Sequence, residues 1–232
     1  MTSRLGTLFT RARDIYREEG LLPLIKIIFA FILSPVVDEY NNFYIYERPL
    51  KEGEEADHLH KIKNVTNKVV ETVEQLEELT SEGFELSSLD ISLAHYRLSK
   101  GAIAFLTFVD SELAYSSWAA FTKEAKKTVN RYPYKVDFKN HEITGGELWT
   151  NPKYRRQGLA YYSSYIREQF LISRGATRNR FIVLADNEAA QMGAAKGGAK
   201  LLAKARYLRI FGLQFWREKP VKSVNKAVTI HE

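Results

Sequence analysis

The chain has 232 residues, of which 45% are hydrophobic and 27% are charged, so it can bury one sizeable core. It contains no cysteine, which excludes disulfides, a thiolate nucleophile and cysteine-based zinc sites, and it favours a cytoplasmic protein. The formal net charge of +6 suits a polyanionic cofactor or an anionic membrane surface as well as it suits nucleic acid.

The N-terminal region is the most apolar part of the chain. Residues 5–19 predict a charged helix that ends at Gly20, and the apolar stretch covers residues 21–37. Its segment Leu21–Leu33 contains one charge, Lys26. At about 1.5 Å per residue this segment is roughly 20 Å long, too short for a hydrocarbon core of about 30 Å. We favour a helix buried in protein, and a helix lying in a membrane interface stays open.

The next elements are a strand and two helices. Tyr40–Leu50 is rich in aromatic and β-branched residues, which predicts the first strand of a sheet. A longer helix is predicted up to Gly83 from apolar residues at helical spacing, namely Val65, Val69, Val73, Leu76 and Leu79. A second, short helix is predicted over Asp90–Leu98.

Two hairpins are then expected. Ala102–Val109 and Leu113–Phe121 are apolar runs separated by a short polar turn, which is a hairpin signal. Lys123–Arg131 is expected to be a basic connector. Tyr134–Phe138 and Glu142–Thr150 predict the second hairpin.

The stretch 152–160, PKYRRQGLA, places a glycine turn with basic neighbours between a strand and a helix. Gly146–Thr150 reads as the end of the strand, and apolar residues at helical spacing follow from Leu159 to Phe170, with Gly175 at the expected helix end. The first N–H groups of such a helix have no intrahelical partner, and the helix dipole adds positive charge there. The turn therefore predicts a phosphate site.

The pattern Arg155-x-x-Gly158-x-Ala160 resembles the acyl-CoA signature of the GNAT superfamily of N-acyltransferases. A return strand at 180–185 follows, and then Asp186-Asn187-x-x-Ala190, which resembles the start of the helix after the fifth strand in that family. The resemblance covers roughly the last 90 residues well and the remainder in outline.

The resemblance implies a fold and a domain organisation. The fold class is α/β (α+β), with a mixed, mostly antiparallel central sheet flanked by helices and a strand–helix–strand acyl-CoA motif. Residues 1–38 are expected to form an N-terminal helical extension, and residues 39–232 a GNAT-like acyltransferase domain. A last strand or strand pair is expected over 205–217.

The resemblance also implies a reaction. An acetyl or other acyl group is expected to pass from acyl-CoA, as co-substrate, directly to a small-molecule or protein amine in a ternary complex. Glu147 is the expected catalytic base, acting directly or through water. By position in the motif, the cofactor-binding residues are Leu148, Thr150, Arg155, Arg156, Gln157, Gly158, Leu159, Ala160 and Asn187.

One departure from the family pattern bears on activity. The family's usual tyrosine acid falls at Ala194, within a segment that keeps Lys196 and Gly198 but has no aromatic residue. Other tyrosines could replace it, namely Tyr161, Tyr162 and Tyr207. The alternative is a catalytically impaired GNAT-fold protein that binds at a membrane surface or to a protein partner.

The remaining expectations concern ligands and partners. The five histidines show no ligand spacing, so no metal is expected, and the basic runs carry no nucleic-acid recognition motif. Peripheral membrane contact through 21–37 and a homodimer stay open. Aromatic residues expected on the acceptor side, each more often found in a core, are Tyr44, Tyr46, Tyr96, Tyr115, Trp118 and Trp149.

Overall fold

The computed structural model describes residues 37–53 and 61–221, so the expected helices over 5–19 and 21–36 lie outside the described residues. Within these two described ranges, no helix has the length and apolarity needed to cross a bilayer. The described residues divide into two compact units, one of 37–42 with 205–218 and one of 43–204 with 219–221.

The described strands form one sheet in the order β2-β3-β4-β5-β6-β1-β7-β8. The strands are β1 (Val37–Pro49), β2 (Val65–Val70), β3 (Ala102–Val109), β4 (Glu112–Ala120), β5 (Glu142–Thr150), β6 (Arg178–Leu184), β7 (Lys200–Ile210) and β8 (Leu213–Pro220). Strand β5 pairs in parallel with β6, whereas the β1–β6, β2–β3, β3–β4 and β4–β5 pairs are antiparallel. The expected mixed, mostly antiparallel sheet is confirmed.

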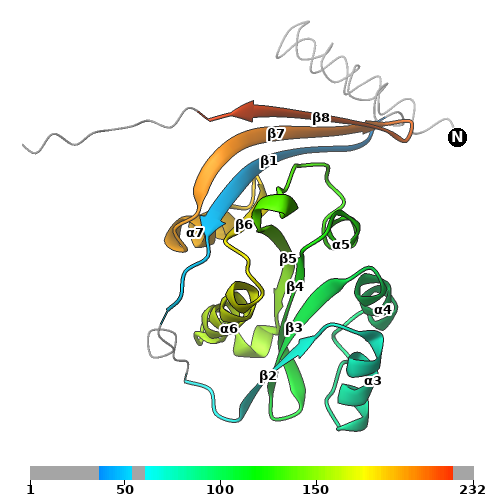
Figure 1. The fold of residues 1–232 in the computed structure, drawn as a ribbon, viewed down its shortest axis with the longest axis vertical. Helices are drawn as coiled ribbons and strands as arrows, with labels where there is room; N and C mark the ends of the chain where they lie inside the picture. The colour runs from blue at the N-terminus through cyan, green and yellow to red at the C-terminus, as the bar shows by residue number, and fades with distance from the viewer. Residues whose placement is uncertain (1–36, 54–60, 222–232) are drawn as a thin grey trace, which may run out of the picture. The chain divides into compact units, whose positions relative to one another are not determined.

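Helices cover both faces of the sheet in the larger unit (Figure 1). They are α3 (Val73–Ser81), α4 (Ile91–Ser99) and α5 (Lys123–Val129) on one face, and α6 (Leu159–Ser173) on the other, with α7 (Glu188–Lys196) after β6. Side chains of β3 alternate between the two cores: Leu106 packs with the α3–α5 layer, and Phe105 packs with Leu171 of α6. The sheet is therefore buried on both faces here.

The predicted helix over 65–79 is wrong in its first half. Val65–Val70 forms strand β2, and the helix begins only after Thr72. Thr72 accepts a hydrogen bond from the Gln75 amide, and the Gln75 side chain accepts one from the Thr72 amide, which is a capping box. The helical spacing of apolar residues continues across the boundary between β2 and α3, so this boundary could not be predicted from the spacing alone.

The second predicted hairpin is also wrong, whereas the first one is confirmed as β3 and β4. Residues 134–137 form no strand, and Phe138–Asn140 is a short 3-10 helix that leads directly into β5. The expected connector at 123–131 contains helix α5, whose N-cap Thr122 accepts a hydrogen bond from Ala125. The predicted short helix at 90–98 is confirmed as α4.

The long helix after the glycine turn is confirmed as α6, and so is its end. Gly175 has φ +82°, its amide donates to Ile172, and the Ala176 amide donates to Leu171. This pair of hydrogen bonds is the Schellman motif. A strand pair at the C-terminal end is confirmed as β7 and β8, although β7 begins at Lys200.

Helix α5 carries a buried lysine, which predicts a pH dependence of stability. Lys126 is 7% exposed and donates to the Tyr132 carbonyl at 2.6 Å, and burial lowers its pKa to about 8. Between that value and 10.5, the unfolded chain binds a proton that the folded chain does not. The free energy of unfolding should rise across this window by at most about 1.4 kcal/mol per pH unit, the limit for a difference of one bound proton.

Denaturant unfolding of Lys126→Met at several pH values tests this. The variant should lack the rise, whereas Lys127→Met, at an exposed neighbouring position, should keep it. The comparison is best made below about pH 10, because burial raises the pKa of Tyr134 and stability is lost above the ordinary tyrosine value of 10.0. Identical pH profiles for the Lys126→Met variant and the unmodified protein would contradict the assignment.

Candidate functional site

Strands β5 and β6 pair over a very short length. Their parallel register contains only Glu142 with Arg178 and Ile143 with Asn179. Next, the Asn179 side chain accepts a hydrogen bond from the Gly145 amide at 3.1 Å, in place of a main-chain partner. Beyond Gly145, β5 stays paired with β4 up to Thr150, but its other edge has no described strand beside it.

A β-bulge lies where β5 leaves β6. Trp118 of β4 faces Gly146 and Ser116 faces Trp149, so the single residue between them on β4 opposes two residues on β5. One of those two is Glu147, which has φ +48°. An extra residue in the left-handed conformation bends the bulged strand and increases its twist. The bulge therefore accounts for the direction in which β5 departs.

Charged side chains hold the paired end of β5 and β6 together. The Arg180 guanidinium donates to Glu142 of β5 at 2.7 Å and to Glu47 of β1 at 2.8 Å. Glu142 is 4% exposed and also accepts from the Asp137 amide. Since a buried carboxylate is tolerated only when it is paired, this clamp fixes three strands at the point from which two of them diverge.

The glycine turn is anchored to the start of β4. The Glu112 carboxylate accepts hydrogen bonds from Lys153 at 2.7 Å, from the Tyr154 hydroxyl at 2.6 Å and from Asn151 at 3.0 Å. The Tyr154 ring is buried in a core cluster that includes Leu159, the first residue of α6. The two ends of the turn are thus fixed, one by the carboxylate and one by apolar packing.

The turn presents unpaired amides at the start of α6. Gly158 is the N-cap, with φ +84°, and no side chain caps the helix. Within the described residues, none of the five main-chain N–H groups from Arg156 to Ala160 donates a hydrogen bond to protein. Such groups attract an anion, and the helix dipole adds to that attraction.

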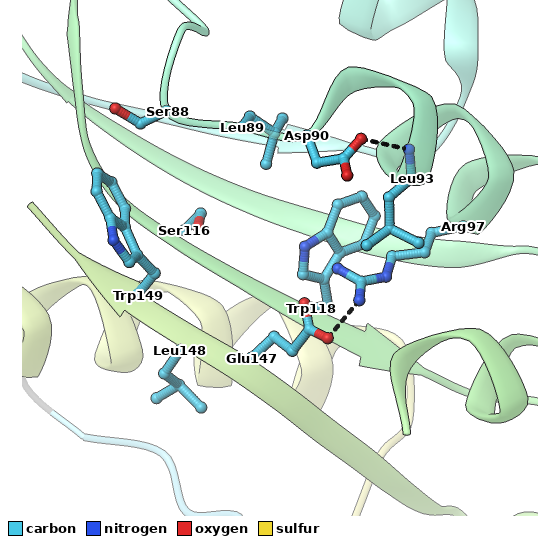
Figure 2. Close-up of a pocket in the computed structure, with 10 residues that line it drawn as sticks. All are labelled: Ser88, Leu89, Asp90, Leu93, Arg97, Ser116, Trp118, Glu147, Leu148 and Trp149. Atoms are coloured by element: carbon cyan, nitrogen blue, oxygen red, sulfur yellow. Dashed lines mark hydrogen bonds and ion pairs between the residues drawn. The ribbon is translucent and has the colours of Figure 1, made fainter. Parts of the chain in front are cut away.

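A pocket of about 290 Å³ lies on the α4 side of the bulge (Figure 2). Its lining combines apolar residues, among them Leu89, Trp118 and Trp149, with the charged residues Asp90, Arg97 and Glu147. Trp118 and Trp149 are thus two of the expected acceptor-side aromatics that do line a pocket. The Asp90 carboxylate is engaged in capping α4, because it accepts from the Leu93 amide at 2.9 Å.

The Glu147 side chain faces a buried arginine in this pocket (Figure 2). Its Oε1 lies 2.5 Å from the Arg97 guanidinium, whose side chain is 5% exposed whereas that of Glu147 is 53% exposed. Arg97 is held in turn by the Thr128 carbonyl and lies over the Trp118 ring at 5.0 Å. The ion pair orients Glu147, and among the described residues its Oε2 has no hydrogen-bond partner.

Among the predicted cofactor residues, some side chains are exposed, one is buried, and others are hydrogen-bonded to the main chain of the protein. Leu148 and Arg156 are exposed, and the Leu159 side chain is buried. Arg155 donates to the main-chain carbonyl of Thr150, another of the predicted cofactor residues, at 2.9 Å. Gln157 donates to the Lys153 carbonyl, so this turn can offer a ligand its main-chain amides more readily than its side chains.

Asn187 and Ala194 lie on α7 rather than on the turn. The Asn187 side chain caps that helix by accepting from the Ala190 amide at 3.0 Å. Ala194 is 8% exposed and packs against Tyr46 and Val183, so its position adds no polar group. Of the substitutes considered, Tyr207 is buried against the Trp216 ring.

Sequence reasoning missed three parts of the site. It did not find Arg97, because an arginine in a short helix gives no sign of burial or of a partner on a distant strand. It also did not find Glu112, although the acids of the turn at 110–112 could have indicated a partner for the basic turn at 153–156. The bulge at Glu147 had no signal, since left-handed φ usually selects glycine or asparagine.

The Glu112 anchor predicts an acid-sensitive contribution to stability. Hydrogen bonds from Lys153 and then Tyr154 hold the pKa of Glu112 below its ordinary value. A lowered carboxyl pKa stabilises the fold above the ordinary value, 4.5, and this contribution disappears as the pH falls through the folded-state pKa. Glu112→Gln should lower the melting temperature at neutral pH, and the deficit should shrink in acid.

Thermal unfolding of both proteins across the acid range measures the effect. Glu77→Gln, on the exposed face of α3, is the matched control and should leave the melting temperature unchanged. A deficit for Glu112→Gln that stays constant down to the lowest pH at which the protein folds would show that its charge is not what anchors the turn.

The comparisons with known proteins agree with this architecture. No protein-family model and no curated protein matches the sequence. Among solved structures, the GCN5-related glucosamine N-acetyltransferase region of a fungal multi-domain GH3 β-N-acetylglucosaminidase is 12% identical, with a TM-score of 0.51 over 85% of this chain. A tandem GNAT protein from the clavulanic acid biosynthesis pathway is also 12% identical, with a TM-score of 0.50 over 84% of this chain.

This chain spans only part of both proteins, 23% of the first and 59% of the second. At such low identity the likeness concerns the fold alone. The chain is a divergent protein with the GNAT fold.

Proposed function

We propose that the chain binds acyl-CoA and transfers its acyl group to an amine. The observation that carries this proposal is the row of unpaired amides from Arg156 to Ala160 at the uncapped start of α6. A pyrophosphate is a dianion with several acceptor oxygens, so it suits convergent N–H donors. Gly158 allows a close approach of backbone to phosphate because it has no side chain.

The open edge of β5 supports the same ligand. Beyond Gly145 this edge has no described strand beside it, and it leads straight to the turn through Thr150. An extended ligand that contains amide groups can pair with a free strand edge as an added strand would. The pantetheine arm of CoA carries two amides and is attached to the pyrophosphate, so one ligand can use both features.

The pocket at the bulge suits the amine acceptor. Its charged groups are Asp90, Arg97 and Glu147, which give a net charge of −1, and two tryptophans form part of its wall. A cationic amine is attracted to such a site and can lie against an indole ring. The Glu147 carboxylate lines the pocket and has one oxygen without a protein partner in the described residues.

The reaction then needs two proton transfers at the nucleophile and one at the leaving group. The bound ammonium first loses one proton to solvent, and the neutral amine then attacks the thioester carbonyl, so that the C–N bond forms and the C–S bond breaks. Glu147 Oε2 takes the second proton from the amine nitrogen, and the departing thiolate takes up a proton from solvent. The Arg97 ion pair has a positioning role, because it fixes the direction of the carboxylate without touching either substrate.

A second candidate function is favoured by Ala194. This position lies against Tyr46 in an apolar cluster and offers no acid for the leaving thiolate. General acid catalysis contributes about 10²–10⁴ in rate, so its absence would suit a protein that binds acyl-CoA and turns it over slowly or not at all. Release of free thiol from acetyl-CoA in the presence of an amine panel separates the two functions.

The first prediction from this proposal concerns CoA affinity. Gly158→Ala should weaken CoA binding about tenfold or more, because a side chain at φ +84° strains the turn and moves its amides. Gly175→Ala is the matched control: it places the same side chain at φ +82° at the other end of α6. It should lose a similar amount of stability and keep the affinity for CoA.

Isothermal titration with CoA and thermal unfolding of both variants give the two readouts. Equal affinities of the two variants for CoA would show that the turn does not hold the ligand. If the unmodified protein gave no binding heat and no thermal protection, the proposal would fail as a whole.

The second prediction concerns Glu147. Glu147→Gln keeps a side-chain oxygen for Arg97 but removes the base, so kcat should fall about 10²-fold or more while the Kd for CoA stays the same. Thiol release with the most reactive amine of the panel measures kcat, and titration measures the Kd. An unchanged kcat would assign Glu147 a structural role only.

A further inference from the structure

The hairpin of β7 and β8 exposes large apolar side chains at its tip. Phe211, in the turn, is 75% exposed, Leu213 is 65% exposed and Phe215 is 52% exposed. These are the highest exposures of apolar residues within the smaller unit. Adjacent exposed apolar residues on a folded domain usually mark an interaction site, and their proximity in one hairpin makes chance exposure a poor explanation.

The backbone conformation of the turn is unfavourable for Phe211, the residue at its first central position. Phe211 has φ +48° and Gly212 has φ +76°, as in a type I′ turn, where asparagine, aspartate or glycine is favoured at the first position. A phenylalanine at this position raises the free energy of the fold, because its backbone is in the left-handed region. Its ring is also exposed to water. Both costs fall on one residue, which points to a function for the ring at this tip.

Side-chain alternation places the apolar and basic residues in order along one face. Tyr207 and Trp216 pack together at 6.4 Å and mark one face of the hairpin. Because successive side chains alternate, the other face carries Leu208, Ile210, Leu213 and Phe215 near the turn, and Arg206 and Arg217 farther from it. The Arg206 guanidinium also lies over the ring of Tyr40, 5.9 Å from its centroid.

The described residues of this unit contain three acids, Asp38, Glu39 and Glu218, and three arginines, Arg206, Arg209 and Arg217, so their formal charges balance. The Glu39 carboxylate accepts a hydrogen bond from Asn41 at 2.7 Å. Asp38 pairs with Arg209 at 3.6 Å and accepts a hydrogen bond from the Gly212 amide at 2.8 Å. Glu218 accepts from the Trp216 ring nitrogen at 2.6 Å, on the opposite face from Arg217. Among the described residues, neither Arg206 nor Arg217 forms an ion pair with an acid. Both arginines therefore keep their charge for an external anion.

The start of strand β1 is bonded to the hairpin turn. Strand β1 begins at Val37, and its next residue, Asp38, bonds to the turn at Gly212.

We propose that this hairpin tip, defined as Phe211, Leu213 and Phe215, enters the interface of an anionic phospholipid bilayer. Arg217 lies four residues beyond Leu213, or about 13 Å along the strand, which suits the headgroup level when the tip is buried about 5–10 Å. Apolar residues at the tip with cations behind them match a membrane surface, which presents phosphate outside hydrocarbon. This inference is independent of acyl transfer.

The absence of cysteine allows a direct test with the full chain. Phe211→Cys carries an environment-sensitive fluorophore at the tip, and Met192→Cys, at a position 59% exposed on α7, carries it elsewhere. Vesicles of equal parts phosphatidylglycerol and phosphatidylcholine should shift the emission to the blue for the label at 211 only. Pure phosphatidylcholine vesicles should cause a smaller shift, and salt should reduce the shift on anionic vesicles.

A second measurement uses unlabelled protein. Phe211→Asn with Leu213→Thr suits the turn and the strand better than the natural residues do, so the variant should fold. Its affinity for the anionic vesicles in a sedimentation assay should fall about tenfold or more, because two apolar side chains no longer enter the interface. Met192→Gln should bind as the unmodified protein does.

Three outcomes would overturn the proposal. The label at 211 could show no shift, or the same shift as the label at 192. The double variant could bind vesicles as tightly as the unmodified protein, which would place the contact in another part of the chain. The unmodified protein could fail to bind vesicles and form a dimer that the double variant lacks, which would assign the tip to a second copy.

Discussion

Strand β5 diverges from β6 because of a β-bulge, in which two residues of β5 lie opposite one residue of β4. The rest of the site depends on this bulge. The bulge at Glu147 comes soon after the last β5–β6 pair, and the clamp of Arg180 on Glu142 and Glu47 holds the strands together up to that point. One side of the divergence is an unpaired strand edge. The other is a pocket in which Glu147 meets Arg97.

The turn after β5 must then be held rigidly without consuming its own amides. Glu112 and the buried Tyr154 ring do this from outside, so that the N–H groups from Arg156 to Ala160 stay available. A helix start without a cap leaves polar groups unsatisfied by protein, and this cost is recovered when an anion binds. The anchor at Glu112 and Tyr154 therefore allows the start of α6 to keep its amides unpaired while the turn stays in place.

The sequence predicted those elements whose local signals agree with one another. Helix α6 has apolar residues at helical spacing and a glycine next to each end, and both of its ends were predicted correctly. Strand β2 was missed because Val65 and Val69 continue the spacing of helix α3, although the Thr72 capping box marks the boundary. The Arg97–Glu147 pair joins residues far apart in sequence, and the position of β1 between β6 and β7 depends on the whole sheet. No local pattern contains either fact.

Amide hydrogen exchange of the full chain, with and without CoA, tests the central claim most directly. The account predicts that CoA slows exchange in two stretches, the turn at 156–160 and the open edge of β5 between Gly146 and Thr150. Residues 104–108 of β3, already paired on both sides, should serve as an internal reference with no change. Protection by CoA elsewhere, with both stretches unchanged, would contradict the claim that the divergence of β5 from β6 creates the cofactor site.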